Sequence, residues 1–308
     1  MKVMVTGGAG FIGSHLVDAL IAQGYEVAIV DDLSTGRRQN LNPAARFYHL
    51  DIGDPALAEV FERERPDIVN HHAAQTSVHI SVNEPKRDAE INTLGSLSLI
   101  ENCRRFGVQK MIYISSGGAV YGEPVYLPCD EDHPINPLCP YGVSKHVFEH
   151  YLYLYRQLYG LNYTVLRYAN IYGPRQDPYG EAGVVAIFAL QMLEDRPVTI
   201  NGSGEQQRDF VYVEDVVRCN LAALERGDGQ TYNVGCGQGT TVNQIFARLK
   251  TITGYKGEPH YGPPKAGETF IIYLDATRAK CELGWEPGVG LEEGLARTVE
   301  YFRSKSNQ

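Results

Sequence analysis

A glycine-rich turn near the N-terminus constrains the fold of this chain more than any other feature. Residues 2–5 form a short apolar run, residues 6–13 contain Gly8-x-Gly10-x-x-Gly13, and residues 14–23 carry apolar side chains near helical spacing. A second apolar run at residues 26–30 ends at Asp31, 18 residues after Gly13. A G-x-G-x-x-G pattern alone is often an ordinary flexible loop. In this context, however, it predicts a dinucleotide-binding strand–helix–strand unit.

The ligand predicted for this unit is NAD. Glycines let backbone N–H groups approach a pyrophosphate held at the N-terminus of the following helix. Asp31 can bond both hydroxyls of an adenosine ribose, and its charge would repel a 2′-phosphate, so NAD is favoured over NADP. Arg37 and Arg38 lie nearby and weaken that preference.

The rest of the chain alternates strand and helix patterns. Apolar runs at residues 46–50, 67–70, 110–115 and 163–167 alternate with helical patterns at 55–65, 85–105 and 141–158. This alternation predicts an α/β fold with a doubly wound parallel sheet. Because 308 residues exceed the usual size of one core, we expect a second, smaller mixed α/β domain. The predicted domains are a Rossmann-type NAD domain at 1–170, with a return near 207–240, and a discontinuous substrate domain at 171–308.

Composition excludes several other functions. A net charge of −9 and a pI near 5.5 leave no electrostatic footprint for nucleic acid or an anionic membrane. No apolar run reaches the ~18 residues of a membrane-spanning helix, and a strand pattern from residue 2 leaves no room for a signal peptide. The six cysteines lack C-x-x-C spacing, which predicts reduced thiols in the cytoplasm. His71 and His72 are adjacent and point to opposite faces of a strand, so no metal site is predicted.

Tyr141 and Lys145 are the residues with the clearest chemical potential. They are four residues apart at a helix start, so their side chains lie on one helix face. A free tyrosine titrates near pH ~10, and a neighbouring ammonium together with the positive nicotinamide of NAD would lower its pKa. A surface tyrosine beside a solvated lysine is the ordinary explanation of such a pair. Ser115 and Ser116 end the preceding strand, at the sheet edge where ligands bind, and this favours the chemical explanation.

Several further segments match a known pattern, at residues 6–13, 31–34, 51–52, 115–122, 140–145, 167–174, 204–216, 233–235 and 283–285. With them, nearly the whole chain resembles the extended short-chain dehydrogenase/reductase family, and most closely its nucleotide-sugar epimerases. The resemblance implies a Rossmann-type fold and tightly bound NAD. It also implies reversible inversion at carbon 4 of UDP-glucose or UDP-galactose through a 4-keto intermediate.

The resemblance also implies roles for individual residues. Tyr141 is the catalytic base and acid, Lys145 binds the nicotinamide ribose and tunes Tyr141, and Ser116 bonds the sugar hydroxyl. The implied NAD contacts are Gly7, Gly10, Phe11, Ile12, Gly13, Asp31, Asp32, Asp51, Ile52, Ala73, Ala74, Gln75, Asn92, Tyr141 and Lys145. The implied UDP-sugar contacts are Ser116, Asn170, Arg208, Lys265 and Asp275. Ile272 matches a position that lines the sugar cavity, where its modest size leaves room for an N-acetylated sugar.

Three features keep alternatives open. Gly117-Gly118-Ala119 adds one residue to the spacing after Ser116, so Ser115 or the Gly117 backbone could share its role. Lys265 stands where the family has a second phosphate-binding arginine, and a point charge there replaces a planar fork. Asp51 could equally cap the helix that begins near residue 55.

Rival functions remain within and beyond the family. Dehydratases need an acidic pair that residues 117–119 do not supply, whereas 4-epimerases of UDP-N-acetylglucosamine or UDP-glucuronate differ only in pocket shape. A non-catalytic NAD-sensing regulator would commonly lack the Tyr or the Lys, and here both stand. Relatives dimerise by pairing the helix from Tyr141 with the helix near residues 90–106, so a homodimer is expected.

Overall fold

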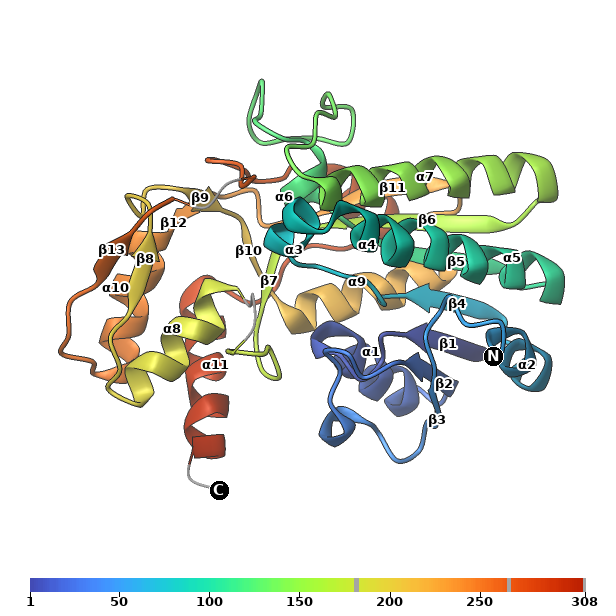
Figure 1. Ribbon diagram of the computed structural model, residues 1–308, viewed down its shortest axis with the longest axis horizontal. Helices are drawn as coiled ribbons and strands as arrows, with labels where there is room; N and C mark the ends of the chain where they lie inside the picture. Colours follow the sequence, from blue (N-terminus) through green and yellow to red (C-terminus); the bar gives the residue numbers. More distant parts are fainter. Residues whose placement is uncertain (180–182, 265–266, 307–308) are drawn as a thin grey trace.

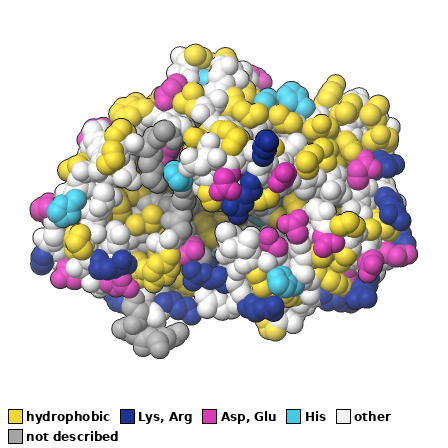
Figure 2. All heavy atoms as spheres, viewed as in Figure 1, with side chains coloured by type: hydrophobic (Ala, Val, Ile, Leu, Met, Phe, Trp, Pro, Cys, Tyr) yellow, Lys and Arg dark blue, Asp and Glu magenta, His cyan; other side chains and the backbone are white. Residues whose placement is uncertain are grey.

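The chain folds into two lobes that lie side by side (Figure 1). A computed structural model describes residues 1–179, 183–264 and 267–306. The larger lobe holds the N-terminus and a seven-stranded sheet, and the smaller lobe holds the C-terminal helix. On the face drawn in Figure 2, acidic and basic side chains are interspersed rather than gathered by sign.

All seven strands of the large sheet run parallel, in the order β11-β6-β5-β4-β1-β2-β3. This is the Rossmann order extended by β11, and it confirms the predicted doubly wound sheet. The strand order reverses between β1 and β4, where such sheets bind ligands at their carboxyl ends. The strands are β1 (Lys2–Thr6), β2 (Glu26–Asp31), β3 (Arg46–His49), β4 (Ile68–His71), β5 (Lys110–Ser116), β6 (Asn162–Tyr168) and β11 (Gln230–Val234).

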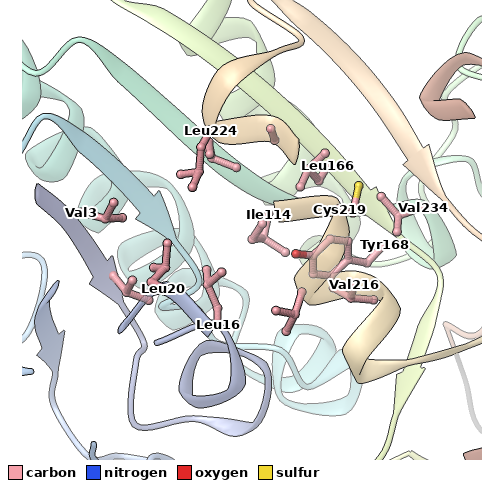
Figure 3. Close-up of a cluster of buried hydrophobic side chains, with 14 of the residues drawn as sticks. Val3, Leu16, Leu20, Ile114, Leu166, Tyr168, Val216, Cys219, Leu224 and Val234 are labelled. Carbon is pink, nitrogen blue, oxygen red and sulfur yellow. The ribbon is translucent and has the colours of Figure 1, made fainter. Parts of the chain in front are cut away.

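Helices cover both faces of the sheet. α1 (Phe11–Ala22) and α9 (Val213–Glu225) pack on one face, and α2 (Leu57–Glu64), α5 (Ser96–Phe106) and α7 (Pro140–Tyr159) pack on the other. Because side chains alternate along a strand, Val3 and Val5 of β1 pack with α1 and α9, whereas Met4 packs on the opposite side. Figure 3 shows the first of these cores, where side chains from the sheet, α1 and α9 gather.

The predicted helix over residues 85–105 is present and contains a wider, π-helical turn. It consists of α4 (Pro85–Ala89), a π-helical turn η2 (Glu90–Gly95) and then α5. The turn carries Asn92, whose Oδ1 accepts from the Gln75 N–H at 2.9 Å and whose Nδ2 donates to the Gln75 carbonyl oxygen at 2.9 Å. The predicted helix is confirmed, but apolar spacing does not report a single wide turn, a feature that is frequent at functional sites.

Three short elements also escaped the sequence patterns: η1 (Arg38–Asn40), α3 (Val78–Asn83) and α6 (Gly117–Val120). Helix α3 begins at a side-chain cap, because the Ser77 hydroxyl oxygen accepts from the Ile80 N–H at 2.9 Å. Helix α6 begins with two glycines, which are poor helix formers, so its sequence predicts a loop.

The smaller lobe has its own hydrophobic core. Phe188, Phe246, Tyr255 and Phe302 pack there. Its elements are α8 (Val184–Leu193), α10 (Val242–Thr253), α11 (Leu291–Ser306), and β8 (Thr199–Asn201) paired with β13 (His260–Gly262). A π-helical turn, η3 (Ala279–Leu283), packs back on the large sheet through Leu283.

Two small strand pairs connect the lobes. β7 (Asn170–Tyr172) pairs with β10 (Phe210–Tyr212), and β9 (Gln207–Arg208) pairs with β12 (Thr240–Thr241). The chain leaves the large sheet after β6 and re-enters it at β11. The division into domains at residue 170, with a return at 207–240, stays a prediction.

Within the described residues, the structure has no helix that is both long and apolar enough to cross a membrane.

Candidate active site

The turn between β1 and α1 is a tight cradle that requires glycine. Gly7 has φ +70°, and a Cβ there would lie 2.7 Å from the Ala73 backbone nitrogen. A Cβ on Gly13 would lie 2.3 Å from the Gly7 carbonyl oxygen. After Gly10, α1 begins with neither a side-chain cap nor an acid in its first turn, so its positive end is open to an anion. The NAD contacts predicted in this turn are Gly7, Gly10, Phe11, Ile12 and Gly13.

Asp31 is held in place at the end of β2. Its Oδ2 accepts from the Ala9 N–H at 2.9 Å and its Oδ1 from the Leu33 N–H at 2.8 Å. Burial raises the pKa of this carboxyl, and the two backbone N–H groups act in the opposite direction. The exposed Asp32 beside it accepts from the Ser34 N–H at 2.9 Å. The cradle and the fixed carboxylate together fit NAD, with Asp31 available to the adenosine ribose.

The two arginines that weakened the preference for NAD are engaged elsewhere. Arg37 Nη2 lies 2.7 Å from Asp177 Oδ1, and Arg38 lies over the Phe47 ring at 5.7 Å from its centre. Neither interaction directs a guanidinium to a phosphate beside Asp31. The structure therefore supports NAD over NADP.

The residues predicted beyond β3 differ in their surroundings. Asp51 is exposed, and its Oδ1 accepts from the Gly53 N–H at 2.6 Å. Asp54, rather than Asp51, bonds the turn before α2, since its Oδ1 accepts from the Ala56 N–H at 2.8 Å. Ile52 is buried in the core with α2 and α5. The alternative of Asp51 as a helix cap is therefore not what the structure shows.

Beyond β4, the chain runs beside the glycine cradle. The Ala73 N–H donates to Thr6 Oγ1 at 3.3 Å, and Ala74 follows it. Gln75 is then fixed by the paired hydrogen bonds between its backbone and the Asn92 side chain. These segments place Ala73, Ala74, Gln75 and Asn92 along the same edge of the sheet as the cradle.

Tyr141, Lys145 and Ser116 come together at the carboxyl end of β5. Tyr141 and Lys145 lie in the first two turns of α7, Ser116 is the last residue of β5, and the side chains of Ser116 and Tyr141 are close enough for Ser116 to affect the Tyr141 pKa. Lys145 Nζ lies 5.9 Å from the centre of the Tyr141 ring and donates to the Ile114 carbonyl oxygen at 2.9 Å. Lys145 is only 3% exposed, so this is no solvated surface pair.

Burial controls the protonation of this group. Burial raises the pKa of Tyr141, although the Ser116 side chain acts in the opposite direction. Burial also lowers the pKa of Lys145 to about 8, against the effect of the Asp88 and Glu149 carboxylates. Lys145 alone therefore does not make Tyr141 acidic; the expectation from the sequence combined Lys145 with the positive nicotinamide of NAD. A phenolate at this position needs further positive charge, such as the nicotinamide of oxidised NAD.

Ser115 and Ser116 serve different sides of β5. The Ser115 hydroxyl donates to Glu149 Oε1 at 2.6 Å, and Arg167 Nη2 donates to Glu149 Oε2 at 2.6 Å. Burial opposes ionisation of Glu149, but hydrogen bonds from His146, Arg167 and Ser115 lower its pKa to about 2. Ser115 is thus committed to a buried ion pair, and Ser116 faces Tyr141. Sequence reasoning missed Glu149, although its position four residues after Lys145 places it on the same helix face.

Asn170 and Arg208, two of the predicted substrate residues, lie on the strand pairs that connect the lobes. A Cβ on Gly118 would lie 3.5 Å from Asn170 Oδ1 and 3.9 Å from Ser116 Oγ, so the structure brings Asn170 and Ser116 together. Arg208 lies on β9, where its Nη1 donates to the Phe270 carbonyl oxygen at 3.3 Å and its Nη2 lies 3.4 Å from Glu268 Oε2. Burial lowers the pKa of Arg208, and Glu268 opposes this effect.

Asp209 organises this side of the site and was not predicted. Its buried carboxylate accepts from the N–H groups of Cys236 at 2.8 Å, Gly237 at 3.1 Å and Leu274 at 3.1 Å. Burial raises its pKa to about 6, and these N–H groups act in the opposite direction. Asp209 therefore ties β9 to two loops that are distant in sequence.

The remaining predicted residues differ in outcome. Asp275 Oδ1 accepts from the Thr277 N–H at 2.7 Å, which is a local turn bond. Ile272 is buried in a cluster with Val120 and Leu274, so it packs beneath the site rather than lining an open cavity. Lys265 lies outside the described residues.

Both ring nitrogens of His71 have protein partners. Nδ1 lies 2.7 Å from Thr6 Oγ1, and Nε2 lies 2.8 Å from Ser96 Oγ. In the part of the chain that the structure describes, no three His, Cys, Asp or Glu side chains gather as a metal site.

A Rossmann-type sheet whose edge carries a half-buried tyrosine beside a buried lysine defines an NAD-dependent enzyme of the short-chain dehydrogenase/reductase type. The model of the NAD-dependent epimerase/dehydratase family matches residues 3–235, and the chain belongs to this family. Its prediction from sequence is confirmed, as is NAD as the cofactor.

Three relatives are similar over their full length. The chain is 56% identical to a UDP-glucose 4-epimerase from Thermotoga maritima crystallised with UDP-glucose, covering 99% of this chain and 100% of that one with a TM-score of 0.98. It is 45% identical to the Thermus thermophilus UDP-glucose 4-epimerase in complex with NAD, covering 98% and 99% with a TM-score of 0.95. It is 46% identical to the UDP-glucose 4-epimerase of Mycolicibacterium smegmatis, covering 99% of this chain and 100% of that protein.

Proposed function

We propose that this protein is a UDP-glucose 4-epimerase, which interconverts UDP-glucose and UDP-galactose and so acts in galactose metabolism. One observation carries the proposal. Half-buried Tyr141 and Ser116 and buried Lys145 gather at the carboxyl edge of a dinucleotide-binding sheet, in a chain 56% identical to an epimerase that holds UDP-glucose.

In this function, Tyr141 carries out the proton transfer. Its phenol oxygen takes the proton of the sugar 4-hydroxyl and later returns it, while Ser116 hydrogen-bonds the same hydroxyl. Lys145 holds positive charge near the phenol ring and is itself oriented by the Ile114 carbonyl. Because Lys145 has a pKa of about 8, it is mostly charged at neutral pH.

The chemistry that NAD supplies when bound is reversible hydride transfer at sugar carbon 4, so no net oxidation occurs. The glycine cradle, the open N-terminus of α1 and Asp31 are the residues that would hold it. Since the same cofactor is restored in each cycle, NAD can stay bound through turnover.

The protein must bind the nucleotide of its substrate firmly and the sugar loosely. The 4-keto sugar has to rotate so that its other face is turned toward the nicotinamide. We assign the grip on UDP to Asn170, Arg208, Lys265 and Asp275. Arg208 is suited to the pyrophosphate because its planar fork can bond two oxygens. Near the sugar, Gly117 and Gly118 supply no side-chain carboxylate, which disfavours the dehydration carried out by some members of the family.

The test is a cofactor-free incubation with three substrates. Purified protein without added NAD is given UDP-galactose, UDP-N-acetylgalactosamine or UDP-galacturonate, and proton NMR follows the anomeric signals. We expect UDP-galactose to convert to UDP-glucose fastest. Faster conversion of the N-acetylated or uronate sugar would assign a different 4-epimerase, and no conversion of any of them would refute epimerase activity.

We also propose a homodimer in the cytoplasm. Large apolar side chains are exposed along α7 and the adjoining turn η2, including Leu94 at 57% and Leu158 at 60% (Figure 2 shows hydrophobic side chains over this edge). A patch of this kind favours pairing of two copies through a two-fold interface. All six cysteines are free, in agreement with a reducing compartment. Sedimentation of the purified protein as a monomer at micromolar concentration would contradict the dimer.

A further inference from the structure

The residue that stands out beside the catalytic group is Asp88, an acid to which no role has been assigned. It lies on α4, is 0% exposed, and its carboxylate is fully used by side chains of the described chain. Oδ1 accepts from Gln75 Nε2 at 2.8 Å and from Asn92 Nδ2 at 3.0 Å. Oδ2 accepts from the Ser144 hydroxyl at 2.6 Å. A buried carboxylate carries a large desolvation cost, so three hydrogen bonds to it indicate a specific role.

The partners of Asp88 connect two parts of the site. Gln75 and Asn92 belong to the edge that we assign to NAD, and their backbone and side chain are already joined by two hydrogen bonds. Ser144 lies between Tyr141 and Lys145 in the first turns of α7 and is itself buried. Asp88 therefore joins the NAD-binding edge to the helix turn that carries the proton-transfer group.

We propose that Asp88 is a positioning residue for the epimerase reaction, one that fixes Tyr141 and Lys145 through Ser144 and stabilises the Lys145 ammonium through its charge. The proposal rests on the proposed function for its reaction, but its geometry does not. Asp88 raises the pKa of Lys145, against the larger lowering by burial. It also raises the pKa of Tyr141, in the same direction as the larger effect of burial. Removing its charge while keeping its shape should therefore lower both pKa values.

Other ionisable groups face the same two side chains, and they must stay unchanged in the test. They are Glu149 on α7, Cys139 at its start, His71 on β4, His72 after it and Tyr113 on β5. Only Asp88 among these groups hydrogen-bonds Ser144 in the described structure. A substitution at Asp88 or at Ser144 therefore separates this connection from the rest of the network.

Two variants separate the charge of Asp88 from its hydrogen bonds. Asp88→Asn can keep all three bonds, because an oxygen at Oδ1 still accepts from both amides and the new NH₂ group can donate to Ser144. We expect both limbs of its pH profile for kcat to move to lower pH by ~0.5–1 unit. Ser144→Ala keeps the charge but removes the connection. We expect ~10-fold lower kcat with unchanged limbs and little change in KM.

Hydrogen exchange of the peptide covering residues 139–148 gives a measurement that does not depend on activity. Ser144→Ala should speed exchange there, whereas Asp88→Asn should not. An unshifted pH profile in Asp88→Asn overturns the electrostatic role, and unchanged exchange in Ser144→Ala overturns the positioning role. If wild-type protein converts no UDP-sugar, the proposed function fails, while the exchange result still decides the positioning role.

Discussion

The two sides of the site are built in different ways. The NAD side is made mostly by backbone from one continuous segment, since β1, the glycine turn, α1 and β2 all lie within residues 2–31. The proposed substrate side is made by side chains from distant segments, including Asn170 on β7, Arg208 on β9 and the loop near Leu274. Asp209, next to Arg208, joins the last two because its carboxylate accepts from the Leu274 N–H, 65 residues away.

This difference matches what the reaction asks of each side. A cofactor that remains bound is served by a rigid backbone cradle, in which almost any added atom clashes. A sugar that must rotate within the site can be bound by a surface assembled from two lobes, whose contacts can differ in strength. In the proposed reaction, proton transfer takes place where the two sides meet, at Tyr141.

The largest effect that tests this comparison is expected from Tyr141→Phe. Losing the hydroxyl removes the proton-transfer group but leaves a ring of nearly the same shape on α7. We expect kcat to fall by at least ~100-fold, while the NAD content and the melting temperature stay close to wild type. NAD released by acid and thermal unfolding would be measured beside turnover. Near-wild-type turnover would show that Tyr141 is not the proton-transfer group. It would also contradict the idea that the two sides of the site meet at this residue.

Sequence reasoning predicted the chain conformation around the glycine turn better than the arrangement of the distant segments near Arg208, for a physical reason. The cradle depends on local chain conformation, so the spacing of Gly7, Gly10, Gly13 and Asp31 carries its geometry. Continuous apolar runs likewise predicted the strands, because each strand packs on both faces, and the alternation of these runs with helical patterns predicted the parallel sheet. What these patterns missed was short: the π-helical turn that carries Asn92, and helix α6 after Ser116.

Buried polar networks were the other omission. Asp88, Glu149, Arg167 and Asp209 are ordinary polar residues in the sequence, and only folding brings their partners to them. Glu149, for example, binds Ser115 and Arg167, which are 34 and 18 residues away. No local pattern encodes such distances. The preference of Tyr141 for its neutral form was also invisible, because burial is a tertiary property.

The next effect in size tests whether the NAD side depends on backbone contact. Gly7 and Gly107 have nearly the same conformation, with φ +70° and +73°, but a Cβ on Gly107 meets no described atom within 4 Å. Gly107→Ala should cost ~1–2 kcal/mol of unfolding free energy through its left-handed backbone. Gly7→Ala should cost a further ~1–3 kcal/mol, because its Cβ meets the Ala73 backbone.

Denaturant unfolding and the NAD-to-protein ratio would distinguish these two variants. We expect Gly107→Ala to retain NAD and Gly7→Ala to lose most of it, with matching loss of turnover. Equal NAD content in the two variants would show that the cradle tolerates an added methyl group. In that case, the close approach of Gly7 to Ala73 would not determine cofactor binding.

The smallest effect should come from Arg208→Lys, which tests the substrate side alone. A lysine keeps the positive charge but replaces a planar fork with a point charge, so we expect UDP to bind ~10-fold more weakly, or ~1.4 kcal/mol. Titration calorimetry with UDP measures this, and the NAD content should not change. Arg248→Lys is a matched control, because Arg248 pairs with Glu292 in the smaller lobe away from the site. If both variants bind UDP like wild type, Arg208 serves Glu268 and Phe270 rather than the pyrophosphate, and the substrate side must hold its nucleotide by other groups.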